Sequence, residues 1–345
     1  MISQRTKERL IAWWEHKELD RPCIMAYTPK YGAVWPEAPA PDDYWLKPDL
    51  LAGQVFQRAR NLRYLGEAQP YLYIDYGACA VGLQMGAKGH WRSLETIWTD
   101  PCVDSADQVA GLHPGGEWKR IQDAAIARAL ELGKGRAMLS SYCLGAAADT
   151  TAALMGTENL LCAMMDEPDA VKRAFEAVKR ETIALFERLV CECEAQDTLL
   201  SGWHAIWAPG PSTPIQEDFS YMIGPGMFDE FCLPHIRDMV DAVPYSFYHL
   251  DGVQALSHLP SLLKIPNLKV IQWQPGEGHS DILQWTEVIE RILKGGKSCQ
   301  VYVKASEVDE LIKRVGKDGM LLIVSGTEQE LKVLEEKYQL ESNLM

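Results

Sequence analysis

From residue 195 to the end of the sequence, short apolar runs alternate with amphipathic segments of helical length. The runs are rich in β-branched and aromatic residues, as buried strands are, and a turn residue separates each run from the helix that follows. Strands that are apolar on both faces and joined by helices form parallel sheets covered on both sides. The pattern predicts strands at 198–204, 245–250, 269–273, 299–304 and 320–325.

The N-terminal half supplies three more expected strands, at 22–27, 71–76 and 136–142, which makes eight. Helices are expected after the later strands, at 226–243, 254–263, 282–294, 307–315 and 328–337. Ser306 and Thr327 are well placed to be the N-caps of the last two helices. Eight strands with regularly spaced helices predict one closed (β/α)8 barrel of the TIM type, formed by residues 1–345 as a single domain.

Two features of the chain bear on this prediction. The proline-rich segment 29–70 is expected to form a helical and irregular excursion that covers the mouth of the barrel. A doubly wound open sheet is the rival architecture, but no GxGxxG or GxxxxGK[ST] loop follows any expected strand.

Composition limits the classes of partner. With 34 basic and 48 acidic residues the formal net charge is −14, which disfavours nucleic acid and anionic membrane surfaces. Nine irregularly spaced cysteines without a CxxC pair predict reduced thiols. The N-terminus lacks the apolar run of a signal peptide, and no stretch approaches the ~20 apolar residues of a membrane span. We therefore expect a cytoplasmic, soluble protein, which could form a homodimer.

Polar and aromatic residues fall where the expected strands end. Barrel enzymes carry their chemistry at the carboxyl ends of the strands, so these residues are expected around a cup at the open end of the barrel. They are Tyr27, Asp75, Tyr76, Tyr142, His204, His249, Asp251, Trp273, Gln274, Lys304 and Ser325. For any one of them, a purely structural role as a strand or helix cap is the simpler interpretation.

The segment 248–252 is the most informative part of this set. His249 and Asp251 are two residues apart on an expected strand, so their side chains point the same way, and Gly252 permits an immediate turn. An imidazole beside a carboxylate can bind a divalent metal or act as an acid/base couple. A hydrogen-bonded pair that only joins strand to loop is the third possibility.

A second group lies on the strand at 198–204 and the proline-stiffened loop after it. His204 and Trp207 are expected in the cup. Glu217 and Asp218 could hold a cationic or hydroxylated substrate, or they could form an exposed acidic turn or a helix N-cap. Tyr142, Trp273 and Gln274 would complete the substrate-binding wall, where tryptophan faces attract flat or methylated groups.

The sequence resembles the uroporphyrinogen decarboxylase superfamily, and within it the branch of cobalamin-dependent methyltransferases. The resemblance is carried by Arg9 with 19–22, by 144–146 with Asp149 and Gly156, by 218–225 with Phe228, Phe231 and Pro234, and by 248–252. It covers most of the chain and implies a (β/α)8 barrel. It also implies a site that transfers a methyl group to a corrinoid.

The departures from the family pattern limit what carries over. Segment 26–32 contains no arginine of the kind that grips tetrapyrrole carboxylates in true uroporphyrinogen decarboxylases, so that activity is not expected. In the methyltransferase branch a His-x-Cys and a later cysteine hold zinc. Here His249 matches, whereas Asp251 replaces the first cysteine and 325–328 contains none. The candidate ligands that remain are His249, Asp251 and Glu328, an oxygen-rich set.

The leading hypothesis is a methyltransferase, or demethylase, component. It would activate the heteroatom of a small O- or N-methylated substrate, through zinc or through proton donation by His249 and Asp251, while a separate corrinoid protein takes the methyl group. The alternatives are a decarboxylase or lyase that receives a small carboxylic acid at Lys304 or His204, and a non-catalytic small-molecule binding barrel.

Overall fold

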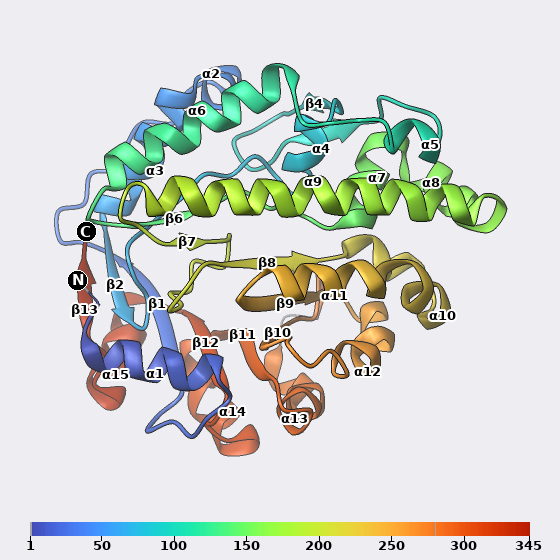
Figure 1. Cartoon of the computed structure of the whole chain (residues 1–345). Coiled ribbons are helices and arrows are strands. Elements are labelled where there is room, and N and C mark those ends of the chain that lie inside the picture. The colour runs from blue at the N-terminus through green and yellow to red at the C-terminus, as the bar shows by residue number, and fades with distance from the viewer. Residues whose placement is uncertain (1, 280) are drawn as a thin grey trace.

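The computed structural model describes residues 2–279 and 281–345 as a mixed α/β fold, with the strands central and the helices outside (Figure 1). The strands are β1 (Cys23–Pro29), β2 (Leu62–Gly66), β3 (Tyr71–Tyr73), β4 (Lys88–His90), β5 (Trp98–Asp100), β6 (Met138–Ser140), β7 (Leu200–Ser201), β8 (Ser212–Gln216), β9 (Tyr245–Asp251), β10 (Val270–Gln274), β11 (Ser298–Lys304), β12 (Met320–Ser325) and β13 (Ser342–Leu344).

The α-helices alternate with these strands along most of the chain. They are α1 (Gln4–Trp14), α2 (Pro41–Leu46), α3 (Pro48–Arg60), α4 (Ala80–Gln84), α5 (Ala106–Val109), α6 (Gly116–Gly133), α7 (Ala147–Met155), α8 (Thr157–Asp166), α9 (Pro168–Glu194), α10 (Pro225–Met227), α11 (Leu233–Ala242), α12 (Leu259–Leu262), α13 (Thr286–Lys294), α14 (Val308–Val315) and α15 (Glu328–Tyr338). A short 3-10 helix, η1 (Asp218–Met222), follows β8.

Among the described residues the strands form three hydrogen-bonded sheets. The largest has the order β13-β2-β1-β12-β11-β10-β9-β8, and every neighbouring pair from β1 to β8 is parallel. The second sheet, β3-β6-β7, is also parallel, and β4 pairs with β5 as an antiparallel hairpin. The prediction of a large parallel sheet between helices is therefore confirmed.

The predicted closure into one hydrogen-bonded barrel is not found in the described part of the chain, where the sheets stay separate. On one side, β7 is only two residues long and Pro214 of β8 has no N–H to donate. The backbone at Gly202 packs so tightly on Pro214 that a Cβ there would lie 2.2 Å from the proline ring. On the other side, β2 runs antiparallel beside β1, and side-chain packing, with the rings of Tyr27 and Tyr71 6.0 Å apart, replaces a ladder to β3.

Helix α1 closes the amino-terminal end of the large sheet. The Trp13 indole donates to the carbonyl of Gly319, before β12, and the Ser298 hydroxyl at the start of β11 donates to the carbonyl of Trp13. Trp13 and Trp14 pack against side chains on one face of the strands, among them Phe247 of β9. This inward face is apolar near α1, so polar chemistry is confined to the opposite, carboxyl-terminal end.

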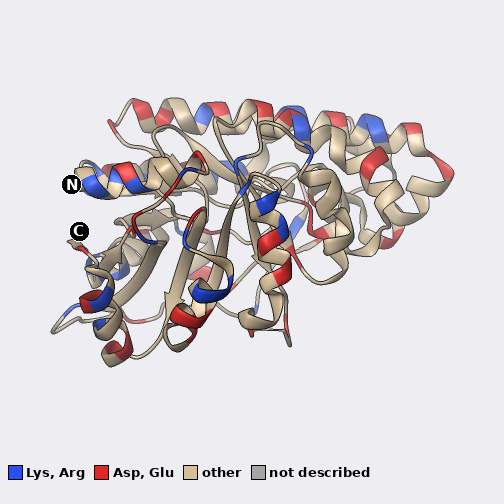
Figure 2. Ribbon diagram, turned by 90° about the horizontal axis from the view of Figure 1, so that it is seen from below, with Lys and Arg blue, Asp and Glu red and all other residues tan. Residues whose placement is uncertain are grey.

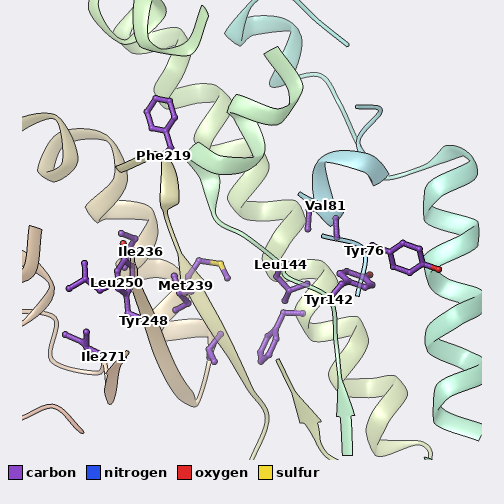
Figure 3. Packing of buried hydrophobic residues seen from close by; sticks show 14 of the residues in the cluster. Tyr76, Val81, Tyr142, Leu144, Phe219, Ile236, Met239, Tyr248, Leu250 and Ile271 are labelled. Carbon is purple, nitrogen blue, oxygen red and sulfur yellow. The ribbon is translucent and has the colours of Figure 1, made fainter. Parts of the chain in front are cut away.

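The other face of the strands packs against the surrounding helices. Because side chains alternate along a strand, Tyr248 and Leu250 of β9 point outward and pack with Ile236 of α11 (Figure 3). His249 and Asp251 consequently share the inward face with Phe247. The same alternation puts Gln272 and Gln274 of β10 on the inward face and Ile271 and Trp273 on the outward face.

Several predicted element boundaries are corrected or confirmed. Strand β12 has the predicted bounds, and the Thr327 hydroxyl caps α15 by accepting from the backbone N–H of Glu330. The prediction for Ser306 is wrong, because a 3-10 turn (Ala305–Glu307) precedes α14 and Glu307 is the residue before the helix. The segment 29–70 contains α3, which packs along α6 outside the sheet, and β2, and it does not line the site described below.

Candidate metal centre at the ends of β8 and β9

Three inward-facing side chains meet where β8 and β9 end. Asp218 follows β8, His249 lies within β9, and Asp251 is its last residue. One ligand atom of each lies within 4.8 Å of those of the other two, and His249 Nε2 is 3.9 Å from Asp251 Oδ2. We call these three residues the acceptor cluster.

The imidazole of His249 is held from behind by a strand neighbour. Its Nδ1 is hydrogen-bonded to the side-chain oxygen of Gln272, which lies directly opposite it on β10. An amide oxygen only accepts, so Nδ1 carries the proton and donates it. The unprotonated Nε2 therefore faces the two carboxylates, which makes the cluster three acceptors pointing at one another.

Asp218 is exposed at the mouth of the site but surrounded by protein on its inner side. Gln216 of β8 donates from its amide to Asp218 Oδ2 at 3.0 Å, and the Trp203 indole donates to the Gln216 oxygen at 3.1 Å. Desolvation raises the pKa of Asp218, as does the nearby charge of Asp251, while His249 and the Gln216 hydrogen bond act in the opposite direction. Loss of water contacts thus makes an isolated negative charge at Asp218 unfavourable.

Two further carboxylates fix the backbone that carries Asp218. Asp149 accepts from the backbone N–H groups of Asp218 at 3.0 Å and Phe219 at 2.7 Å, while Glu217 accepts from that of Ala148 at 3.1 Å, at the start of α7. Asp149 of α7 thereby caps the start of η1, and Glu217, the residue before η1, caps the start of α7. Burial raises the pKa of both Asp149 and Glu217; the next cause is the charge of Asp218 for Asp149 and the charge of Asp149 for Glu217.

Two depressions meet at Asp218 and Met222. The first, with a volume of about 640 Å³, is lined by Asp218, Asp251, Glu277, His279, Tyr221 and the turns around Gly252 and Gly276. The second, of about 500 Å³, lies between η1 and α7 and is lined in part by Cys79, Thr99 and Asp149. No Lys or Arg is among the described residues lining either one, although Lys and Arg are spread among acidic residues over the outer helices (Figure 2).

The structure does not bring His204 or Trp207 to the acceptor cluster. His204 is buried, with its ring 4.9 Å from that of Phe247 and 6.1 Å from that of Trp14. The carbonyl of Trp207 accepts from the Trp14 indole, and its side chain lines a different depression beside Lys7 and Met138, at the amino-terminal end of the strands. The chain after β7 turns back toward α1, which the strand prediction for 198–204 could not show.

Tyr142 and Trp273 are in the outer packing layer, away from the cluster. Tyr142 is fully buried, accepts a hydrogen bond from Gln84 and packs near Tyr76 (Figure 3). Trp273 is also fully buried, with its ring 5.3 Å from that of Trp285.

Three other predicted residues, Gln274, Glu328 and Lys304, lie at separate places in the fold. Gln274 lies opposite Asp251 on the inward face. Glu328 lines a depression between α15 and β2 and is not part of the acceptor cluster. The Lys304 ammonium is exposed and 3.6 Å from Glu307.

Sequence reasoning missed residues that complete the site. Gln216, Gln272 and Gln300 lie side by side with His249 at the same level of β8, β10 and β11. A glutamine inside an apolar run was the available signal, because buried polar side chains need partners. The register that makes them neighbours of His249 could be seen only in the structure.

Comparison with solved structures identifies a fold similar to that of this chain. A methyltransferase from Methanosarcina mazei superposes with a TM-score of 0.64 over 97% of this chain and 99% of that one, with 12% sequence identity. At that identity the similarity establishes a shared fold. No family model matches the sequence, and no curated protein matches it either. Among the described helices, none has the length and apolar character needed to cross a membrane.

Proposed function

We propose that this protein is a methyltransferase that binds a divalent metal through Asp218, His249 and Asp251 and uses it to activate a small O- or N-methylated substrate. The structural likeness to a methyltransferase over nearly the whole length of both chains supports this reaction class. The sequence resemblance to the cobalamin-dependent branch of the uroporphyrinogen decarboxylase superfamily supports the same class independently.

The observation that carries the proposal is the mutual orientation of three acceptors. His249 Nε2 has a lone pair, both aspartates offer carboxylate oxygens, and all lie within 4.8 Å of one another. Asp251 Oδ1 is buried without a hydrogen-bond partner among the described residues. A cation between the groups would relieve the repulsion among these acceptors.

The three ligand groups suit a divalent metal that prefers nitrogen and oxygen ligands to sulfur. One imidazole and two carboxylates are common ligands of zinc, and the hydrogen bond behind His249 is the outer contact that metal-binding histidines usually have. A zinc ion would supply Lewis-acid assistance to the departing oxygen or nitrogen. Glu328, a candidate ligand from the sequence, is replaced in this proposal by Asp218.

Other parts of the protein would position the metal ligands and receive the substrate. Gln216 holds the Asp218 carboxylate, and Gln272 orients His249. The hydrogen bonds made by Asp149 and Glu217 fix the backbone at the start of η1 and at the start of α7. The depression of about 640 Å³ beside Asp251 would receive the substrate. A corrinoid carried by a separate protein would accept the methyl group at this open end.

The acidic surroundings disfavour the decarboxylase or lyase alternative. Neither of the groups considered as carboxylate receptors, Lys304 and His204, lines the two depressions, and no Lys or Arg is among the described residues that do. A small carboxylic acid would therefore meet like charge at Asp218 and Asp251 without a Lys or Arg side chain to offset it.

Metal content and methyl transfer test the proposal together. Purified protein is dialysed against zinc, analysed for bound metal, and incubated with free cob(I)alamin and a panel of methyl ethers and methylamines, with methylcobalamin measured by absorbance. We expect about one zinc per chain and methylation with at least one substrate class. Asp218→Asn and His249→Gln should lose both metal and activity.

The matched control is Glu328→Gln, which removes the acidic residue favoured by the sequence but not by the geometry. It should keep the metal. Zinc retained in the Asp218 and His249 variants would refute the proposed centre, whereas zinc bound without methyl transfer to any tested substrate would refute the reaction class.

A further inference from the structure

A row of glutamines continues from His249 across the large sheet. The Gln272 amide nitrogen donates to the side-chain oxygen of Gln300, and the two residues are in register on β10 and β11. Both glutamines are fully buried. We call Gln272 and Gln300 the glutamine relay.

We propose that the glutamine relay sets the tautomer of His249, and that Gln272 and Gln300 are positioning residues for the metal centre. This inference rests on the proposed function, because it assigns Nε2 of His249 to the metal. The relay itself concerns only hydrogen bonds within the chain and can be tested without any substrate.

The direction of the relay follows from its chemistry. A primary amide has an acceptor end and a donor end, so once Gln272 donates to Gln300 its oxygen must face His249. The imidazole then needs a proton on Nδ1. A relay running the opposite way would place an amide N–H against Nδ1, leave the proton on Nε2, and turn His249 and Asp251 into a proton-donor couple 3.9 Å apart.

The far end of the relay has an energetic consequence. The amide nitrogen of Gln300 is buried without a partner among the described residues, and an unsatisfied buried donor lowers the stability of the fold. Leucine at this position would avoid that cost. Unlike leucine, Gln300 accepts a hydrogen bond from Gln272 and thereby holds the amide oxygen of Gln272 toward His249.

The relay uses neutral amides, whereas the histidines of metal sites often have a carboxylate behind them. A neutral partner fixes the imidazole without adding a further negative charge next to Asp218 and Asp251. In a chain with a net charge of −14 this difference limits the repulsion that must be overcome before the metal arrives.

The tautomer can be read directly by NMR of the full-length, metal-free protein. Protein labelled with ¹⁵N-histidine is studied at pH 8, where long-range ¹H–¹⁵N correlations distinguish the two neutral tautomers, and His249 is assigned from the spectrum of His249→Gln. We expect the Nδ1–H form in the wild type. Gln272→Met should shift His249 toward the Nε2–H form, and Gln272→Glu, which retains an acceptor for Nδ1–H, should restore the wild-type signal.

Zinc affinity gives the second measurement. Loss of an outer hydrogen bond typically lowers metal affinity about 10–100-fold, so we expect that loss for Gln272→Met and a smaller loss for Gln300→Met. The matched control is Gln122→Met, which breaks another buried glutamine pair, with Gln84 at 2.6 Å, in the helix layer. It should change neither the tautomer nor the affinity.

The outcomes separate the relay from the proposed function. An Nε2–H tautomer in the wild type, or an unchanged tautomer in Gln272→Met, overturns the relay. An Nδ1–H tautomer that depends on Gln272, in a protein that binds no zinc, supports the relay and counts against the metal centre alone.

Discussion

Replacing His204 with asparagine should remove a large part of the acid sensitivity of this protein. His204 is 3% exposed, and its Nδ1 accepts from the backbone N–H of Ile206 at 3.0 Å. Burial lowers the pKa of His204 to about 3, so the folded protein keeps this imidazole neutral well below neutral pH. In the unfolded chain the same group has an ordinary pKa of about 6.5.

The sign and size of the effect follow from linkage. A histidine whose pKa is lowered by folding contributes its full stability above the unfolded value, and loses it as the pH falls from about 6.5 toward the folded value. At pH 5 the unfolded chain gains about 2 kcal/mol by protonating this one imidazole, while at pH 8 it gains almost nothing. An asparagine oxygen can accept from Ile206 and does not titrate.

The free energy of unfolding is measured by urea titration at pH 8 and pH 5, followed by tryptophan fluorescence. His16, His235 and His258 also have lowered pKa values, so both proteins should lose stability at pH 5. The difference in loss between wild type and His204→Asn isolates His204 and should be about 2 kcal/mol. Equal losses in the two proteins would show that His204 is solvated or charged in the folded state, which contradicts its placement in the core.

Three other predictions test separate parts of the structure. Trp203→Phe, which removes the indole donor to Gln216, should weaken zinc binding, whereas Trp207→Phe at the opposite end should leave it unchanged in the same titration. Glu67→Gln should lower the free energy of urea unfolding by about 3–5 kcal/mol, because Glu67 is buried and receives two arginines and a backbone N–H. Gly252→Ala should cost about 1–3 kcal/mol by the same assay and reduce bound zinc, because φ is +83° and a Cβ would lie 2.7 Å from the Tyr221 ring.

Alternation of apolar runs and amphipathic segments was enough to predict the parallel strands from β9 to β12. These strands are largely buried on both faces, so their sequences are mostly apolar runs interrupted by single polar residues. Strand β8 was missed because Pro209, Pro211 and Pro214 made the region look like a loop. Whether the sheets close depends on the short β7 and on the antiparallel β2, and neither is encoded in a local pattern.

The candidate site was predictable where two functional residues share one strand and hidden where they come from different strands. His249 and Asp251 belong together because of strand alternation alone. Asp218 joins them because β8 pairs with β9 and places Gln216 beside His249. Tyr142 and Trp273 were predicted in the cup because they end strands, but the direction of a side chain at a strand end depends on register, which the sequence does not specify.

The placement of the polar residues explains why the site forms where it does. Inward-facing strand residues near α1, among them Phe247, are apolar and pack with Trp13 and Trp14. Further along the strands Gln216, His249, Gln272 and Gln300 form one polar row, with hydrogen bonds joining the last three. Asp218 and Asp251 lie just beyond this row, where water can still reach them. Each step toward the mouth replaces apolar packing by neutral hydrogen bonds and then by the charges of Asp218 and Asp251, which lie where a cation can enter.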